Sequence, residues 1–231
     1  EEKIAERIDA NLLNVPIQKL ADLPKVMYEN KINKLMKKTQ GKLIIKEYPT
    51  ASAHVGHFKS LLNELALKRS IKPDIIFIDY LNICASQRYK GSIVNSYTYV
   101  KAIAEELRGL AVEANVPIVS ATQTTRAGYG SSDVDLTDTS ESFGLPATAD
   151  LMFALISTEE LEEMNQIMVK QLKNRYYDPT LNKRFCIGID RSKMRLYDVD
   201  DAQKDLVDSG QEEQVIKKVQ GKKSFAELKY D

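Results

Sequence analysis

Lys-Pro-Asp-Ile-Ile-Phe-Ile-Asp-Tyr-Leu-Asn-Ile-Cys, residues 72–84, is the stretch that decides the fold class expected for this chain. Residues 75–78 form a continuous β-branched and aromatic run, which follows a proline and is too short for a helix. Such a run is typical of a strand that is buried on both faces of a parallel sheet. Asp79 ends this run, and the carboxyl end of a central parallel strand lies at the rim where α/β sheets bind ligands.

The carboxylate of Asp79 suggests a particular chemistry. A carboxylate cannot be buried without a partner, so it needs a metal ion, a water network or a cation. An apolar strand that ends in aspartate is the Walker B arrangement, in which the carboxylate holds the magnesium ion of a nucleotide. The alternative is that Asp79 caps the following loop, because an apolar run followed by aspartate is common. The motif alone leaves both interpretations open.

The rest of the chain alternates between helical and strand-like segments. We expect helices at residues 1–14, 26–38, 53–69 and 96–114, the last of them capped by Asn95 or Ser96. We expect strands at residues 43–48, 74–79, 117–122, 151–156, 167–172, 185–189 and 194–199. This order predicts an α/β fold with a predominantly parallel sheet flanked by helices, and with antiparallel strands at the C-terminal side.

Composition limits the classes of partner. The 33 basic and 33 acidic residues cancel, so no overall field recruits nucleic acid or a membrane, and any such binding must be local. The two cysteines lie in apolar runs and are expected to be buried free thiols in a reducing compartment. We see no stretch long enough to span a membrane and no signal peptide, so we expect a soluble, intracellular protein without a membrane partner.

Gln123 comes at the end of the strand expected at 117–122, just as Asp79 ends the one at 74–79. A crossover helix separates the two strands, so in a parallel sheet both side chains lie at the same rim. A neutral amide both donates and accepts, which suits the sensing of a terminal phosphate or an attacking water. The residues that follow, 124–148, are a long polar stretch, and a loop of that length is usually functional. The alternative is that Gln123 only caps its strand.

Three longer segments carry a resemblance to a known family. They are Ile-Asp-Tyr-Leu-Asn-Ile-Cys (78–84), Ser-Tyr-Thr-Tyr-Val-Lys-Ala-Ile-Ala-Glu-Glu-Leu-Arg (96–108) and Ser-Ser-Asp-Val-Asp-Leu-Thr-Asp-Thr-Ser-Glu-Ser-Phe-Gly-Leu-Pro-Ala-Thr-Ala-Asp (131–150). Up to about residue 199, the chain resembles the RecA-like motor domain of the DnaB family of hexameric replicative helicases, in the version found in T-even-type phages. The resemblance implies an ATP-dependent motor that moves along single-stranded DNA as a ring and unwinds duplex DNA 5′ to 3′. It also implies a primase and a helicase loader as partners, and the host cell cytoplasm as the location if a phage encodes the chain.

The same resemblance implies roles in ATP hydrolysis. Asp79 resembles the Walker B aspartate, which ligates Mg²⁺ through water, and Gln123 resembles the glutamine that couples the nucleotide to the DNA loop. Lys173 and Arg175 match the family's Lys-x-Arg pair, which reaches from one subunit to the phosphates bound by its neighbour. An always-charged planar donor suits charge that spreads over a transferring phosphoryl group. Without the resemblance, Leu172–Tyr176 would be interpreted as a basic surface stretch.

The resemblance also implies contacts with DNA. The residues concerned are Arg126, Ser140, Glu141 and Ser142. Residues 137–144 match the family's Ser-Asp-x-Arg-Glu-Ser-Gly segment, which contacts the backbone of single-stranded DNA. Here the arginine is replaced by Ser140 and the glycine by Phe143. Loss of the arginine removes a charge that pairs with phosphate, so backbone amides and hydroxyls must contribute more to DNA binding.

A phosphate-binding P-loop motif is absent from the 231 residues. None of the ten glycines begins a Gly-x-x-x-x-Gly-Lys-Ser/Thr run. The backbone amides of such a loop supply most of the binding of a triphosphate. We therefore expect residues 1–199 to be a partial motor domain whose P-loop portion lies upstream, and residues 200–231 to be a charged, mobile tail. On its own, this polypeptide is expected to bind ATP weakly and to hydrolyse it barely.

Two other functions are compatible with these residues. A RecA-type recombinase would share Asp79 and Gln123, and strand exchange in place of fork unwinding would distinguish it. A non-catalytic remnant that binds single-stranded DNA or docks onto a helicase ring would show no ATP hydrolysis under any complementation.

Overall fold

The computed structural model describes residues 1–89, 94–124, 135–136, 144–178 and 180–199. The chain divides into two compact units, Glu1–Tyr197 and Asp198–Asp231, and the description that follows concerns the first. The expected division into a motor portion up to residue 199 and a mobile tail stays a prediction. The residues expected to bind DNA, namely Arg126, Ser140, Glu141 and Ser142, lie outside the described residues.

The four long helices follow the expected segments closely: α1 (Glu2–Leu13), α2 (Lys25–Lys38), α3 (Val55–Arg69) and α4 (Ser96–Ala114). The shorter helices are η1 (Ile17–Lys19), η2 (Leu81–Ile83), α5 (Gly144–Thr148) and α6 (Glu159–Glu163). α5 lies within residues 124–148, a stretch that was expected to be a loop. The Oδ1 atom of Asn95 accepts a hydrogen bond from the backbone N–H of Thr98 at 2.8 Å, which confirms the predicted cap of α4. No helix in the described part of the chain is both long and apolar enough to cross a membrane.

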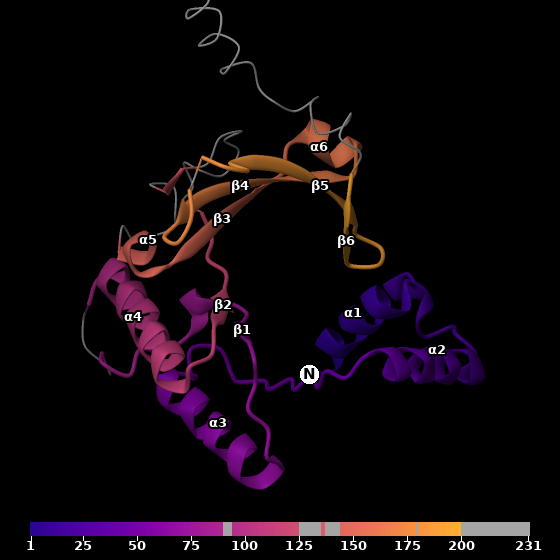
Figure 1. Cartoon of the computed structure of the whole chain (residues 1–231), viewed down its shortest axis with the longest axis horizontal. Coiled ribbons are helices and arrows are strands. Elements are labelled where there is room, and N and C mark those ends of the chain that lie inside the picture. The colour runs from indigo at the N-terminus through magenta and orange to yellow at the C-terminus, as the bar shows by residue number, and fades with distance from the viewer. Residues whose placement is uncertain (90–93, 125–134, 137–143, 179, 200–231) are drawn as a thin grey trace, which may run out of the picture. The chain divides into compact units, whose positions relative to one another are not determined.

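The described strands form two sheets. The strands are β1 (Ile76–Ile78), β2 (Ile118–Ser120), β3 (Leu151–Ile156), β4 (Gln166–Asn174), β5 (Arg184–Asp190) and β6 (Arg195–Asp198). β1 and β2 pair in parallel, with Ile78 opposite Ser120. The other four lie side by side in the order β3-β4-β5-β6 (Figure 1), and β3-β4 and β4-β5 are antiparallel. A parallel sheet, an antiparallel sheet and flanking helices are therefore all present, as the sequence predicts.

Two expectations about strands are wrong in detail. Residues 43–48 form no regular secondary structure, because their backbone joins no ladder with the described strands. β1 is not buried on both faces, since the Phe77 side chain is 70% exposed. Phe77 lies opposite Val119, which is 46% exposed, so these two side chains share a face that the described residues leave open. The apolar run predicted the strand correctly but not how much of it is covered.

The main apolar core surrounds α4. Its buried members are Leu81, Cys84, Val100, Ile103, Ala104, Leu107 and Leu145, with Ile78, Phe58 and Tyr99 packed against them. α4 contacts α3, α5 and η2, so one helix holds both the segment that follows β1 and the start of α5. This packing fixes the two places where the predicted functional residues lie, namely the carboxyl ends of β1 and β2 and the junction of β4 with α5.

Candidate functional site

The carboxyl ends of β1 and β2 lie beside one another and remain connected after the strands end. The Ser120 hydroxyl donates a hydrogen bond to the carbonyl of Ile78 at 2.8 Å. Beyond the strands, the Leu81 N–H donates to the carbonyl of Ala121 at 3.3 Å. The Thr122 hydroxyl donates to Oδ1 of Asn82 at 2.8 Å. Because these bonds join the two segments, the residues between them are held at one end of the parallel sheet.

Asp79 and Gln123 both lie at this end and are both exposed. Asp79 directly follows β1, and Gln123 comes three residues after β2. The two side chains are therefore on neighbouring segments at the same end of the sheet, and they are not enclosed by packed aliphatic residues. An exposed carboxylate and an exposed amide in this position are able to bind a ligand that approaches from solvent.

The residues at this end fit a magnesium ion that arrives with a nucleotide. Mg²⁺ keeps several of its waters and is bound through one or two carboxylates together with the phosphates of a substrate. Asp79 supplies one such carboxylate. No group of three or more His, Cys, Asp or Glu side chains that could hold a metal ion occurs in the described ranges. The single carboxylate of Asp79 therefore fits a magnesium ion whose further ligands are waters and phosphate oxygens.

Lys173 lies near the end of β4 and Arg175 directly follows the strand, two residues further on, so their side chains point to the same side. Both bind the carbonyl groups at the end of the short helix α5. The ammonium of Lys173 donates to the carbonyl of Pro146 at 2.5 Å and to that of Ala147 at 3.4 Å. Nη2 of Arg175 donates to the carbonyl of Ala147 at 3.0 Å. These carbonyls have no partner within the helix, and basic side chains are the natural donors there.

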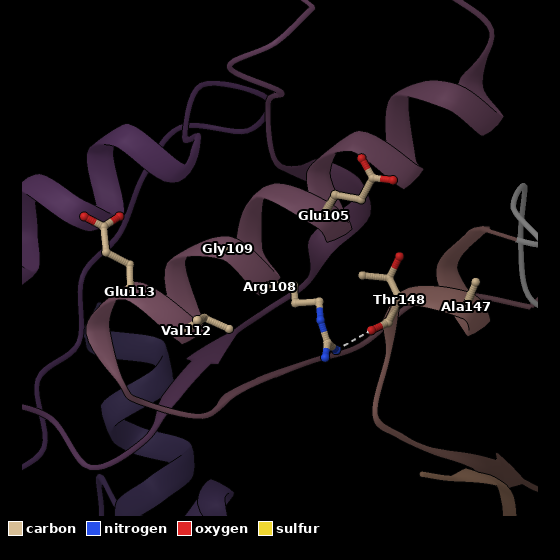
Figure 2. A pocket seen from close by; sticks show the side chains of 7 residues that line it. All are labelled: Glu105, Arg108, Gly109, Val112, Glu113, Ala147 and Thr148. Carbon is tan, nitrogen blue, oxygen red and sulfur yellow. Dashed lines mark hydrogen bonds between the residues drawn. The ribbon is translucent and has the colours of Figure 1, made fainter.

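Asp150 connects this pair to α4. Its Oδ1 atom lies 2.9 Å from Nη1 of Arg175 and accepts a hydrogen bond from Nη1 of Arg108 at 2.7 Å. Arg108 also donates to the carbonyl of Thr148 at 2.7 Å, a bond that Figure 2 shows across the open groove between α4 and α5. Three basic side chains therefore contact α5 and Asp150, the residue directly before β3. They are Arg108 of α4, Lys173 of β4 and Arg175 directly after β4.

Burial and the charges of this cluster shift the pKa values of Asp150 and Lys173, and the hydrogen bond to Asp150 raises the pKa of Arg108. Burial would raise the pKa of Asp150, but the hydrogen bond from Arg108 and the charges of Arg108 and Arg175 outweigh it and hold that pKa below its ordinary value. Burial lowers the pKa of Lys173, and the neighbouring charge of Arg175 lowers it further. The lowered pKa of Asp150 shows that the positive charges of its two arginine partners outweigh its burial.

The sequence alone did not single out Arg108 or Asp150 as members of this cluster. A usable signal was present, because Asp150 directly precedes the apolar run of β3, and a carboxylate at such a place needs a partner. Lys173 and Arg175 are brought together with each other and with α5. No hydrogen bond or ion pair among the described residues joins them to Asp79 or Gln123 in the same chain.

Comparisons with solved structures place the fold in the RecA-like class of ATPase domains. A solved structure described as an ATPase domain matches with a TM-score of 0.70 and 17% identity, over 87% of this chain and 72% of that one. A structure of a DnaB-like replicative helicase and its interactions with primase matches with a TM-score of 0.67 and 18% identity, over 84% of this chain and 47% of that one. The predicted α/β, RecA-like fold class is thereby confirmed.

The chain belongs to the family described as the DnaB-like helicase C-terminal domain, whose model matches residues 1–184. It is 45% identical over 203 residues to the DnaB-like replicative helicase of Enterobacteria phage T4. That alignment covers 87% of this chain and 43% of the phage T4 protein, so the chain spans less than half the length of this relative. The resemblance stated from the sequence is confirmed at the level of the family.

Proposed function

We propose that this chain is part of the ATP-dependent motor of a replicative DNA helicase, which moves along single-stranded DNA as a hexameric ring. The observation that carries the proposal is the exposed pair of Asp79 and Gln123 at the carboxyl ends of two adjacent parallel strands. Membership of the DnaB-like helicase C-terminal domain family supports the same function. Unwinding 5′ to 3′, association with a primase and a loader, and action in the host cytoplasm belong to this proposal.

The residues of the site have distinct tasks in this mechanism. Asp79 would hold the waters of a magnesium ion, and that ion, when bound, neutralises charge on the phosphates of ATP. Gln123 would orient the attacking water or contact the terminal phosphate, because its amide both donates and accepts. Arg175 and Lys173 would stabilise negative charge on the phosphates bound by the neighbouring subunit. Because the 231 residues contain no P-loop motif, the cradle for the triphosphate would have to come from another segment.

The first test is the variant Asp79→Asn in a preparation supplemented with a P-loop-containing segment. We expect DNA-stimulated ATP hydrolysis to fall by about 10²-fold or more, since loss of a metal ligand removes several kcal/mol of transition-state stabilisation. The matched control is Asp74→Asn, which removes an exposed carboxylate at the opposite end of the same strand. Hydrolysis that persists in Asp79→Asn at the rate of Asp74→Asn would refute the role of Asp79.

The second test asks whether Arg175 acts on the neighbouring subunit. Asp79→Asn and Arg175→Ala subunits are each expected to be inactive, but a mixture restores one complete site wherever an Arg175→Ala subunit faces an Asp79→Asn neighbour. In a ring of head-to-tail contacts with random mixing, about one quarter of the interfaces have this arrangement. We therefore expect the mixture to recover hydrolysis, and a mixture no more active than its two components would exclude action across the interface.

A further inference from the structure

The structure shows the Arg175 side chain bound within its own chain, at a place where the proposed function needs it to face a neighbour. Both terminal nitrogens are used, Nη1 by Asp150 at 2.9 Å and Nη2 by the carbonyl of Ala147 at 3.0 Å. The side chain is nevertheless 41% exposed. The guanidinium is thus fixed by two contacts on its inner side and remains open to solvent on its outer side.

The register of the sheet creates the contact between Asp150 and Arg175. The Arg175 N–H donates to the carbonyl of Asp150 at 2.9 Å, which extends the antiparallel ladder one step beyond the pair Leu151–Asn174. The two residues are therefore direct cross-strand neighbours, and such neighbours have Cβ atoms about 4.5–5.5 Å apart. The register shifts between Met152 and Phe153. Without that irregularity, Asp150 would lie opposite Asn174, and Arg175 would not be its direct cross-strand neighbour.

Arg108 limits how far Asp150 neutralises Arg175. The same Oδ1 atom of Asp150 that contacts Arg175 also accepts a hydrogen bond from Arg108 at 2.7 Å. Arg108, Lys173 and Arg175 together carry three positive charges against the one carboxylate of Asp150. Arg175 is therefore held in place without being fully paired, and its charge remains available to a second anion.

We propose that Asp150 is the positioning residue for Arg175, an inference that rests on the proposed role of Arg175 towards a phosphate. The carboxylate fixes the guanidinium against the end of α5, so its remaining N–H groups are presented outward in one orientation. Because α5 begins at Gly144, directly after the segment proposed to bind DNA, the same contacts join Arg175 to the element that follows this segment. Asp150 itself does not touch the phosphate.

The test is a double-mutant cycle on ATP hydrolysis, in the preparation used to test the proposed function. Asp150→Asn is expected to lower kcat by about 10–10²-fold with little change in the KM for ATP, since misplacing a catalytic group by about 1 Å costs up to this factor. Arg175→Ala is expected to lower kcat by roughly 10³-fold or more. The double variant should then be no slower than Arg175→Ala alone, because Asp150 acts only through Arg175.

Controls separate positioning from folding. Asp150→Glu keeps the charge and should recover part of the lost kcat, and the thermal unfolding of each variant is measured alongside. The matched control is Asp190→Asn, because the Asp190 side chain is as exposed as that of Asp150 and also forms an ion pair, with Lys193. A double variant slower than Arg175→Ala by the full Asp150→Asn factor would overturn the inference. So would a loss of activity in Asp190→Asn equal to that in Asp150→Asn.

A measurement on this chain alone distinguishes failure of the inference from failure of the proposed function. Arginine side-chain ¹⁵N spectra, with the Arg175 signal assigned from Arg175→Lys, should show a restrained guanidinium in the wild type and a more mobile one in Asp150→Asn, where only the contact with Ala147 remains at full strength. A guanidinium equally mobile in both proteins overturns the inference, whatever the ATPase result. If the Arg175 guanidinium is restrained in the wild type but the wild-type preparation does not hydrolyse ATP, the contact between Asp150 and Arg175 is supported and the proposed function is refuted.

Discussion

Replacing Glu106 with alanine should destabilise the chain measurably, because its carboxylate organises the loop that follows β1. Oε1 accepts hydrogen bonds from the Ser86 hydroxyl at 2.6 Å and from the Arg88 N–H at 3.1 Å. Oε2 accepts one from the Gln87 N–H at 2.9 Å. These bonds connect α4 to the residues immediately after Cys84, a member of the apolar core.

The expected loss of stability depends on which of these donors can bind water once the carboxylate of Glu106 is removed. Gln87 and Arg88 are exposed, so their N–H groups can turn to water when Glu106 is removed. Ser86 is 3% exposed, and its hydroxyl would be left without this acceptor inside the protein. A hydrogen bond to a charged group contributes about 1.5–3 kcal/mol, and a buried group left unsatisfied costs about 1–3 kcal/mol. We therefore expect Glu106→Ala to lower the free energy of unfolding by roughly 2–4 kcal/mol.

Urea denaturation followed by circular dichroism measures this change. The matched control is Glu113→Ala on the same helix, whose carboxylate pairs, among the described residues, with the exposed Lys59 and should contribute less than about 1 kcal/mol. In a Ser86→Ala background, Glu106→Ala should lower the free energy of unfolding much less than it does in the wild type. Both substitutions abolish the same buried hydrogen bond, so their effects are not additive. If Glu106→Ala is no less stable than Glu113→Ala, the loop is not held by this carboxylate and the reasoning fails.

Two further predictions concern a helix cap and an ion pair. Nδ1 of His54 accepts a hydrogen bond from the Gly56 N–H at 3.0 Å at the start of α3. His54→Ala should therefore lower the free energy of unfolding by about 1 kcal/mol. His54→Asn keeps a capping acceptor, so thermal melts should show that it retains most of the wild-type stability. Asp150 has a lowered pKa in the folded chain, so its charge stabilises the fold above about pH 4 and ceases to do so as the pH falls through the folded pKa. The stability difference between wild type and Asp150→Asn should therefore be constant from pH 7 to about pH 5 and shrink below about pH 4, and a difference that grows on acidification would contradict this sign.

Features set by neighbouring residues in the sequence were predictable. The cap at Asn95 follows from residue type at the start of a helix, and it is present. The apolar runs predicted β1 and β3 as strands, because β-branched and aromatic residues favour extended backbone wherever they pair. The common end shared by Asp79 and Gln123 followed from the parallel pairing of β1 with β2.

Features that depend on how strands pair could not be predicted in the same way. The exposure of Phe77 depends on what covers one face of β1, and residues 43–48 lack a partner strand in the described part of the chain, although their composition suits one. The contact of Asp150 with Arg175 depends on a one-residue shift in register, which no pattern in the sequence specifies. Sequence reasoning therefore identified Arg175 through a motif but not the carboxylate beside it.

Asp79 and Arg175, the two residues proposed to act on the nucleotide, differ in the contacts that they already make within the chain. Asp79 is exposed and open to a hydrated ion from solvent, whereas Arg175 is already bound to Asp150 and Ala147. A guanidinium has five N–H donors in a fixed plane, so two internal contacts leave the others free for a phosphate. The ammonium of a lysine carries its three donors on one nitrogen, so a lysine at this position would hold the same partners in a less fixed geometry. Arginine at this position can therefore remain attached to its own chain while it contacts a neighbour, and release from Asp150 is not required.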